Sequence, residues 1–235
     1  PANISVNASL GLCAATVTYT TPGGTDNCSG SVTTQIAGLS SGTSFPVGVT
    51  TNTFSVTDGS SNSATCSFTV TVVDNQPPTI ACPANINVNA SLGICAANVS
   101  YSTPVGADNC AGTTVSQTVG AASGASFPIG TTTNTFRATD AAGNTSTCSF
   151  TVTVIDNQAP AITCPSNISV NNSPGFCNAV VTYTAPVGTD NCPGQTTVLT
   201  SGLASGATYP IGTTTNVYTV TDAGGNSTTC SFTVT

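Results

Sequence analysis

Residues 148–154 read Cys-Ser-Phe-Thr-Val-Thr-Val, and this stretch decides the fold class. Apolar side chains alternate strictly with hydroxylated ones along it, and the apolar ones are Cys148, Phe150, Val152 and Val154. Because successive side chains of an extended strand point to opposite faces, the alternation gives one apolar and one polar face. We therefore predict a half-buried β-strand over 148–154.

The residues before this stretch predict its partner strand. Asn134, Phe136 and Ala138 alternate with Thr and Arg side chains, and residues 140–144, Asp-Ala-Ala-Gly-Asn, have the composition of a tight turn. The two strands and the turn form a predicted hairpin. Similar alternation covers 85–89, and no helical period occurs. The pattern favours an all-β chain built from antiparallel, immunoglobulin-like β-sandwiches.

The stretch and its surroundings recur every 82 residues. Three cysteines return twice at this spacing without insertion or deletion: Cys13, Cys28 and Cys66, then Cys95, Cys110 and Cys148, then Cys177, Cys192 and Cys230. Strict recurrence of this kind is typical of tandem modules. We predict three domains, 1–76, 77–158 and 159–235, the first truncated at its start and the third at its end. Since such modules contact mainly their neighbours, we expect them to form a rod.

The composition excludes most catalytic chemistry. Among 235 residues there are one basic residue, eight acidic residues and no His, and the acidic residues are all Asp. Without His, Lys or Glu the usual general bases, Schiff-base amines and imidazole ligands are missing, so we predict that the chain is not an enzyme. The net charge of −7 disfavours nucleic acid as a partner. No apolar run is long enough for a membrane span.

Several strings of the second repeat together resemble the hyalin repeat (HYR) family. They are Pro-Pro-Thr-Ile-Ala-Cys-Pro at 77–83, Asp-Asn at 108–109, Phe-Pro-Ile-Gly at 127–130, Thr-Asp-Ala-Ala-Gly-Asn at 139–144 and the stretch 148–154. The resemblance covers all three repeats. It implies immunoglobulin-like modules used in tandem in extracellular or cell-surface proteins, for adhesion or as spacers, without a catalytic site. The pair represented by Cys95 and Cys110 departs from the simplest form of the pattern.

Cysteines at this density and in full register predict disulfides in an oxidising compartment. Zinc is disfavoured because neither Cys-x₂-Cys spacing nor His occurs. In an immunoglobulin-like sandwich the starts of the first and last strands lie at the same pole, which favours Cys82 with Cys148 and Cys164 with Cys230. Cys66 then has its partner position just before Pro1.

The second cysteine pair leaves two alternatives open. One joins Cys95 to Cys110 within a repeat, although roughly 20 Å of extended chain separates them unless the loop folds back, and a disulfide needs Cα atoms within about 7 Å. The other joins neighbouring repeats, Cys13 to Cys110 and Cys95 to Cys192. We favour the pairing within a repeat. The cysteines predicted to form disulfides are then Cys82, Cys148, Cys164, Cys230, Cys13, Cys28, Cys95, Cys110, Cys177 and Cys192.

In the predicted fold, we expect three aspartate carboxylates to converge at each junction between repeats. The two sets are Asp74, Asp108 and Asp140, and Asp156, Asp190 and Asp222. Ca²⁺ binds six to eight oxygens of this kind, and the linker 156–160 resembles the calcium-binding junction of cadherins. The alternative is that Asp and Asn only cap turns through hydrogen bonds to the backbone. Both interpretations stay open, with calcium as the one expected cofactor.

The remaining surface features concern location and partners. The predicted glycosylation sites, all Asn-x-Ser/Thr, are Asn3, Asn7, Asn89, Asn98, Asn144, Asn167, Asn171 and Asn226. We predict an extracellular or cell-surface structural protein, a segment of a disulfide-stabilised rod or filament whose partners are neighbouring repeats or copies of itself. The alternative is a cell-surface adhesin that binds carbohydrate or protein through its repeat loops.

Overall fold

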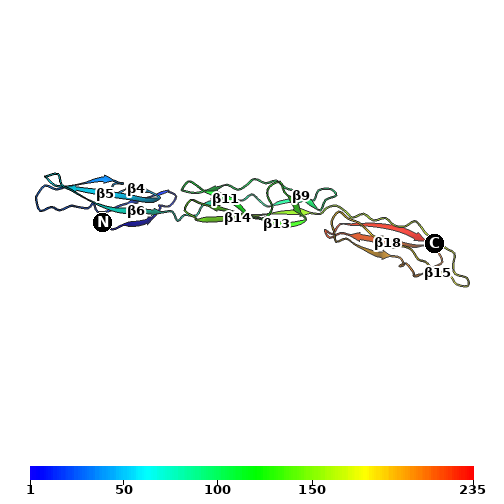
Figure 1. Cartoon of the computed structure of the whole chain (residues 1–235). Coiled ribbons are helices and arrows are strands. Elements are labelled where there is room, and N and C mark those ends of the chain that lie inside the picture. The colour runs from blue at the N-terminus through cyan, green and yellow to red at the C-terminus, as the bar shows by residue number, and fades with distance from the viewer. The chain divides into compact units, whose positions relative to one another are not determined.

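The computed structural model describes residues 1–235 and contains strands, turns and loops but no helix (Figure 1). The all-β prediction is confirmed. Accordingly, no helix suited to crossing a membrane is present. The chain divides into two compact units, of which the first contains 1–83, 103–119 and 135–149 and the second contains the rest. With repeats 1, 2 and 3 defined as the ranges predicted above, the first unit contains the junction of repeats 1 and 2, and the second that of repeats 2 and 3.

Repeat 1 is a sandwich of two sheets. The larger sheet has the order β1-β6-β5-β3 and consists of β1 (Ile4–Asn7), β6 (Ser63–Val73), β5 (Gly48–Thr57) and β3 (Val32–Ala37). The smaller sheet pairs β2 (Ala14–Val17) with β4 (Thr43–Pro46). Most pairs are antiparallel, as predicted, but β1 runs parallel to β6. Since the first and last strands share one direction, the chain enters repeat 1 at one end and leaves it at the other.

The core of repeat 1 lies between these two sheets and follows the predicted alternation. Phe45 on β4 faces Phe54 on β5 and Phe68 on β6, and all three are buried. The Tyr19 ring packs edge-on against each of them, at 4.9 Å between centroids for Phe68. Its hydroxyl donates to the Leu39 carbonyl at 2.6 Å. Burying such a ring is stable because its polar end has a partner.

A glycine and a buried asparagine shape the irregular edge of the same sheet. The side chain of Asn52 is fully buried, and its Oδ1 accepts from the Leu39 amide at 2.7 Å. Gly38 has φ of +91°, and a Cβ atom there would collide with Asn52. Only glycine fits this position, directly after the irregularity in the β3–β5 register.

Repeat 2 contributes strands to both units. In the first unit, β7 (Thr79–Ile80) pairs with β10 (Gly106–Ala107), and β11 (Thr114–Val119) pairs with β13 (Gly130–Thr139). In the second unit, β8 (Ile86–Asn89) runs parallel to β14 (Thr145–Ile155), and β9 (Ala96–Asn98) pairs with β12 (Ser126–Pro128). The stretch 148–154 therefore lies in β14. The predicted partner strand is β13, its neighbour in the sheet, and the hairpin is confirmed.

Repeat 3 repeats this plan with more tyrosines in its core. Its sheets have the orders β16-β18-β19 and β15-β17, with β15 (Asn178–Val180), β16 (Thr196–Ser201), β17 (Thr208–Pro210), β18 (Thr214–Thr221) and β19 (Ser227–Val234). Tyr209 and Tyr218 occupy the positions that Phe45 and Phe54 have in repeat 1, two repeats earlier, and both are buried. Burial and hydrogen bonds to the hydroxyls of these two residues raise the pKa of Tyr183 above its ordinary value.

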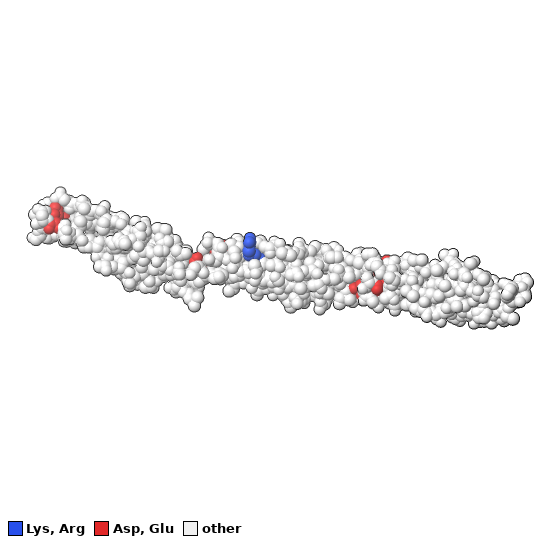
Figure 2. All heavy atoms as spheres, turned by 90° about the horizontal axis from the view of Figure 1, so that it is seen from below, with Lys and Arg blue, Asp and Glu red and all other residues white.

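Charge is sparse over the visible surface. Figure 2 shows one basic side chain and a few small acidic groups on an otherwise uncharged face. The basic side chain is that of Arg137, the single Lys or Arg of the chain, and it is exposed.

Candidate functional site at the repeat junctions

Two disulfides close individual repeats. Cys82 is bonded to Cys148, and Cys164 to Cys230, with Cα atoms 5.6 Å apart in each case. These are the two pairs that the sequence favoured. Cys82 lies between β7 and β8 and is bonded to the last strand of repeat 2, and Cys164 lies before β15 and is bonded to the last strand of repeat 3.

The other two disulfides join neighbouring repeats. Cys13 is bonded to Cys110 and Cys95 to Cys192, with Cα separations of 4.9 and 5.0 Å. The preference for a bond between Cys95 and Cys110 was therefore wrong. The loop does not fold back within its repeat, because Asn109 beside Cys110 is hydrogen-bonded to Leu12 of the repeat before it.

Three cysteines are free, and all three are exposed: Cys28, Cys66 and Cys177. The prediction that Cys28 and Cys177 form disulfides was wrong, because it assumed pairing within each repeat. Once pairing runs between repeats, Cys28 in repeat 1 and Cys177 in repeat 3 have no partner within these 235 residues. Cys66 is free, in line with the sequence-based expectation for it.

The Asp-Asn-Cys loop of each repeat, at 26–28, 108–110 and 190–192, has the same internal geometry. In each loop the Asp Oδ2 accepts from the Cys amide two residues later, at 3.1, 3.0 and 2.8 Å. This Asx-type turn fixes the direction of the cysteine. In the second loop Asn109 Nδ2 also donates to the Leu12 carbonyl at 3.0 Å, which ties the loop to the neighbouring repeat.

The linker after each of the first two repeats is fastened to a turn of the repeat that it leaves. We call this turn, which ends in a cysteine and covers residues 9–13, 91–95 and 173–177 of the three repeats, the cysteine turn. Gln76 Oε1 accepts from the Gly11 amide at 2.7 Å, and its Nε2 donates to the Ser9 carbonyl at 3.1 Å. At the second junction Gln158 Oε1 accepts from Gly93 at 2.8 Å. The glutamine and the disulfide therefore hold the same turn from two sides.

The hairpin turn of the following repeat completes the junction. Asn144 Nδ2 donates to the Asp74 carbonyl at 3.2 Å, and Asn226 Nδ2 donates to the Asp156 carbonyl at 3.1 Å. The same amides donate to Asp140 and Asp222 of their own turns at 2.8 and 2.9 Å. These asparagines connect the hairpin to the linker.

Asp140 and Asp222 therefore act as turn caps. Each carboxylate accepts from the backbone and side chain of the Asn four residues later. Burial acts to raise the pKa of Asp140, but the hydrogen bonds from Asn144 and the turn amides outweigh it and leave the pKa below its ordinary value. The capping interpretation fits these two residues.

The other aspartates come together at the junctions. Carboxylate oxygens of Asp74 and Asp108 lie within 4.8 Å of each other, as do those of Asp156 and Asp190. The nearby sulfurs of Cys110 and Cys192 are in disulfides and are not thiolate ligands. Of each predicted set of three carboxylates, two converge and the third stays with its own turn.

Several oxygens at the junctions are buried without a hydrogen-bond partner. At the first junction this is Asp74 Oδ2, and at the second they are Asp156 Oδ2, Asp190 Oδ1 and Asn191 Oδ1. A buried, unpartnered carboxylate oxygen costs free energy, which a hard cation with oxygen ligands would offset. This donor set fits Ca²⁺ in chemistry, and the second junction fits it better than the first.

The predicted glycosylation sites fall into two groups. Six of the asparagines are exposed: Asn3, Asn7, Asn89, Asn98, Asn167 and Asn171. Asn144 and Asn226 are only half-exposed, and their Nδ2 atoms donate the junction hydrogen bonds described above. A glycan on Nδ2 would break these bonds, so the structure does not favour these two sites.

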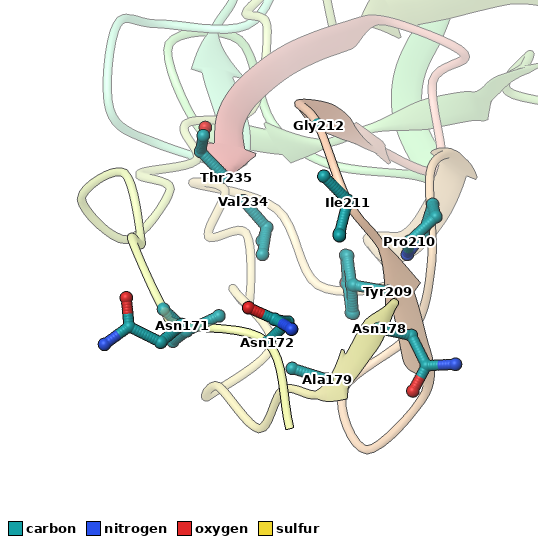
Figure 3. A pocket seen from close by; sticks show the side chains of 11 residues that line it. Asn171, Asn172, Asn178, Ala179, Tyr209, Pro210, Ile211, Gly212, Val234 and Thr235 are labelled. Carbon is teal, nitrogen blue, oxygen red and sulfur yellow. The ribbon is translucent and has the colours of Figure 1, made fainter. Parts of the chain in front are cut away.

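A cavity of about 220 Å³ lies at one end of repeat 3, near Val234 and Tyr209. Figure 3 shows the side chains of Val234, Ile211 and Tyr209 around it, with Asn171 pointing away from it. None of its lining residues is acidic or basic. The cavity therefore offers apolar contacts and amide hydrogen bonds but no acid–base chemistry.

Comparison with protein families settles the relationship of this chain. The HYR domain matches three times, at residues 1–72, 73–154 and 155–235. The chain belongs to the HYR domain family. Its immunoglobulin-like, tandem character is thus shared with a family of non-enzymatic modules.

Individual proteins of known sequence or structure are similar to this chain. The HYR chain is 37% identical over 238 aligned residues to hyalin of the sea urchin Strongylocentrotus purpuratus, covering 99% of this chain and 20% of that protein. It is 32% identical over 158 residues to the serine-rich adhesin for platelets of Staphylococcus aureus, covering 57% and 7%. Among solved structures, Drosophila N-cadherin domains EC1-3 align over 100% of this chain and 97% of that chain, with 13% identity and a TM-score of 0.38.

The HYR chain thus spans only a small part of its relatives' lengths. One of these relatives is an adhesin for platelets by name, and the similarity to it covers only 7% of its length. Sequence reasoning found every cysteine and aspartate of the junctions. Nothing in the sequence pointed to Gln76 and Gln158, and it indicated Asn144 and Asn226 only as glycosylation sites, because neither the alternation nor the 82-residue period shows which turn lies opposite a linker.

Proposed function

We propose that this chain is a structural segment of an extracellular rod or filament in which each repeat is covalently locked to the next. The observation that carries the proposal is the pair of disulfides between repeats, Cys13 with Cys110 and Cys95 with Cys192. A polypeptide linker alone acts as a hinge. A second covalent connection between the same two modules removes most of that freedom.

Other contacts at the junctions support a stiff connection. Gln76 and Asn144 fasten the linker to the repeats on both sides of it. The parallel pairing of β1 with β6, and of β8 with β14, sends the chain in at one end of a repeat and out at the other, which suits stacking end to end. Such a segment would carry tension through disulfides as well as through the backbone.

Calcium is a second, separable part of the proposal. Asp74 with Asp108, and Asp156 with Asp190, would supply carboxylate oxygens, and Asn191 would add an amide oxygen at the second junction. The bound ion would neutralise two adjacent carboxylates and stiffen the linker further. Asp140 and Asp222 would support the site through their turns without binding the ion.

Small-angle X-ray scattering of the full chain tests the stiffness. The variant with Cys13, Cys110, Cys95 and Cys192 all replaced by Ser should show a smaller radius of gyration and a broader distance distribution than the wild type. Replacing Cys82 and Cys148 by Ser is the matched control, since that disulfide lies within one repeat. Equal scattering from the junction variant and the wild type would contradict the proposal.

Calorimetric titration with Ca²⁺ tests the ion. Binding should be lost when Asp156 and Asp190 are replaced by Asn, and retained when the exposed Asp26 is replaced by Asn. Unchanged melting temperature in the presence and absence of chelator, together with no binding heat, would remove calcium from the proposal and leave the disulfide lock intact.

A binding role is the second candidate, favoured by the similarity to a platelet adhesin and by the cavity beside Tyr209. In that case the exposed loops or the cavity would bind carbohydrate or protein. A glycan array separates the two roles, because specific binding that is lost on replacing Tyr209 and Ile211 by Ala supports the adhesin. Mass spectrometry of the protein from its source would also show whether the six exposed asparagines named above carry glycans.

A further inference from the structure

We propose that the disulfide Cys95–Cys192 and a Ca²⁺ ion at the second junction depend on each other: reducing the bond weakens ion binding, and the bound ion makes the bond harder to reduce. The inference rests on the proposed function and deepens it by naming what regulates the calcium site. The sulfur of Cys192 and one carboxylate oxygen each of Asp156 and Asp190 lie within 4.8 Å of one another. The disulfide is therefore part of the wall of the proposed ion site.

The two carboxylates of this site each use one oxygen to hold their direction. Asp156 Oδ1 accepts from the Gln158 amide at 3.1 Å, and Asp190 Oδ2 accepts from the Cys192 amide at 2.8 Å. The remaining oxygens, Asp156 Oδ2 and Asp190 Oδ1, are buried without a partner, and Asp156 as a whole retains only 6% of its accessible surface. Carboxylate oxygens that are fixed, buried and unpartnered are stabilised by a hard cation.

A circuit of contacts holds the two carboxylates in place, and the disulfide is its covalent step. From Asp156 the circuit runs through Gln158 to the cysteine turn, where Gln158 Oε1 accepts from the Gly93 amide at 2.8 Å. Cys95 at the end of that turn is bonded to Cys192, whose amide donates to the second carboxylate. When the bond opens, the Asp-Asn-Cys loop loses its connection to the cysteine turn, and the spacing of the ion's ligands is no longer fixed.

The backbone limits the size of this effect. Ala161 and Thr189 exchange two backbone hydrogen bonds of 2.8 Å each, which hold the loop near the linker whether or not the disulfide is present. Reduction therefore loosens the ion site without dismantling it. We expect the calcium affinity to fall by about tenfold, near the low end of the range for coupled sites.

Asn191 connects the sulfur to the ion site directly. Its Nδ2 donates to Cys192 Sγ at 3.2 Å, and its Oδ1 is buried without a partner. The hydrogen bond to sulfur thus sets the direction in which the amide oxygen is offered. At the first junction the corresponding Asn109 Nδ2 also donates to the Leu12 carbonyl at 3.0 Å, and Asp74 Oδ2 is the one oxygen left buried and unpartnered. We therefore place the coupling at the second junction.

The coupling acts in both directions. An ion that binds the bonded form about tenfold more tightly than the reduced form makes the bond about tenfold harder to reduce at saturating Ca²⁺. Dithiothreitol reduces the bond by two exchanges. Its first thiolate forms a mixed disulfide with one cysteine and releases the other, and its second thiolate closes the reagent's ring and releases the first cysteine. The protein disulfide gains two electrons and two protons, and dithiothreitol loses the same.

An equilibrium redox titration of the full chain tests the coupling. The protein is equilibrated at a series of ratios of reduced to oxidised dithiothreitol, with saturating Ca²⁺ or with a chelator, then alkylated and mapped. The ratio that reduces half of the Cys95–Cys192 bond should be about tenfold higher with Ca²⁺, whereas the disulfide that closes repeat 3 should not respond. The shift should be lost in the variant Asp156→Asn/Asp190→Asn and smaller in Asn191→Ala.

Calorimetric titration with Ca²⁺ tests the reverse direction. All proteins in this experiment carry Asp74→Asn, so that the heat comes from the second junction. The variant C95S/C192S should bind Ca²⁺ about tenfold more weakly than its parent. C164S/C230S is the matched control, because it opens a disulfide within repeat 3, and it should bind as its parent does.

Three results would overturn the inference. They are a half-reduction ratio that does not respond to Ca²⁺, equal calcium affinity with and without the Cys95–Cys192 bond, and no calcium binding by the oxidised protein. The redox titration needs no substitution, so misfolding of a variant does not obscure its result. Scattering in the presence of chelator measures the disulfide lock alone, so the rod can fail while the coupling holds, and the reverse.

Discussion

Loops 26–28 and 108–110 have the same sequence, Asp-Asn-Cys, and the same hydrogen bond from the Cys amide to the Asp carboxylate. They differ in their surroundings. Cys28 is exposed and free, whereas Cys110 is buried and bonded to Cys13 of the preceding repeat. The comparison shows that the loop is shaped by its own repeat. The neighbour contributes burial and a covalent bond without reshaping it.

The same comparison applies to the hairpin turns. Asn62 donates to Asp58 of its own turn, and Asn144 donates both to Asp140 and to the linker carbonyl of Asp74. The second turn gains its additional partner only because a linker lies against it. A junction is therefore assembled from parts that are already rigid, which lowers the conformational entropy lost when they come together.

The largest change in stability should come from removing the Cys13–Cys110 disulfide, which loop 108–110 has and loop 26–28 lacks. Replacing Cys13 and Cys110 by Ser removes a cross-link between residues 97 positions apart and should destabilise by about 2 to 5 kcal/mol. Cys28→Ser should change stability by less than about 0.5 kcal/mol, as for an ordinary surface substitution. Urea unfolding of both variants measures the difference, and equal midpoints would show that the junction bond has no stabilising role.

A smaller effect should separate the two hairpin turns. Asn144→Ala loses the side-chain hydrogen bonds to Asp140 and to the linker, whereas Asn62→Ala loses only the side-chain hydrogen bond to Asp58, and both variants keep the backbone one. We expect the first variant to be less stable than the second by about 1 kcal/mol, the net value of one additional hydrogen bond. The two melting curves decide this, and a larger loss in Asn62→Ala would contradict the assembly described here.

The sequence could predict the strands and turns within one repeat, but not the contacts between two neighbouring repeats. Alternation along 148–154 predicted β14, and the period of 82 predicted the repeats. The 82-residue period could not decide the partner of Cys110. Cys13 and Cys95 are equivalent positions of successive repeats, so either pairing gives the same recurring pattern. The prediction of three converging carboxylates at each junction was only partly right. The sequence indicates that Asp140 lies near the linker, but it does not show that hydrogen bonds from Asn144 keep the Asp140 carboxylate in its own turn.

The smallest effect concerns pH. Hydrogen bonds from Asn62 lower the pKa of Asp58, and those from Asn144 keep the pKa of Asp140 below the ordinary value of 3.8 in spite of burial. A depressed pKa in the folded state stabilises above the unfolded pKa, and this stability is lost as pH falls through the folded pKa. Melting temperature should therefore decrease below about pH 4, and less so in Asp140→Asn. A melting temperature that rises on acidification would contradict this.

Disulfide mapping tests the central claim most directly. The chain has a single Arg and no Lys, so digestion with pepsin under acidic, non-reducing conditions is suited to it, and low pH also suppresses thiol exchange. We predict linked peptides that contain Cys13 with Cys110 and Cys95 with Cys192. Peptides that instead join Cys95 to Cys110 would show that the repeats are closed separately and that no covalent lock holds them together.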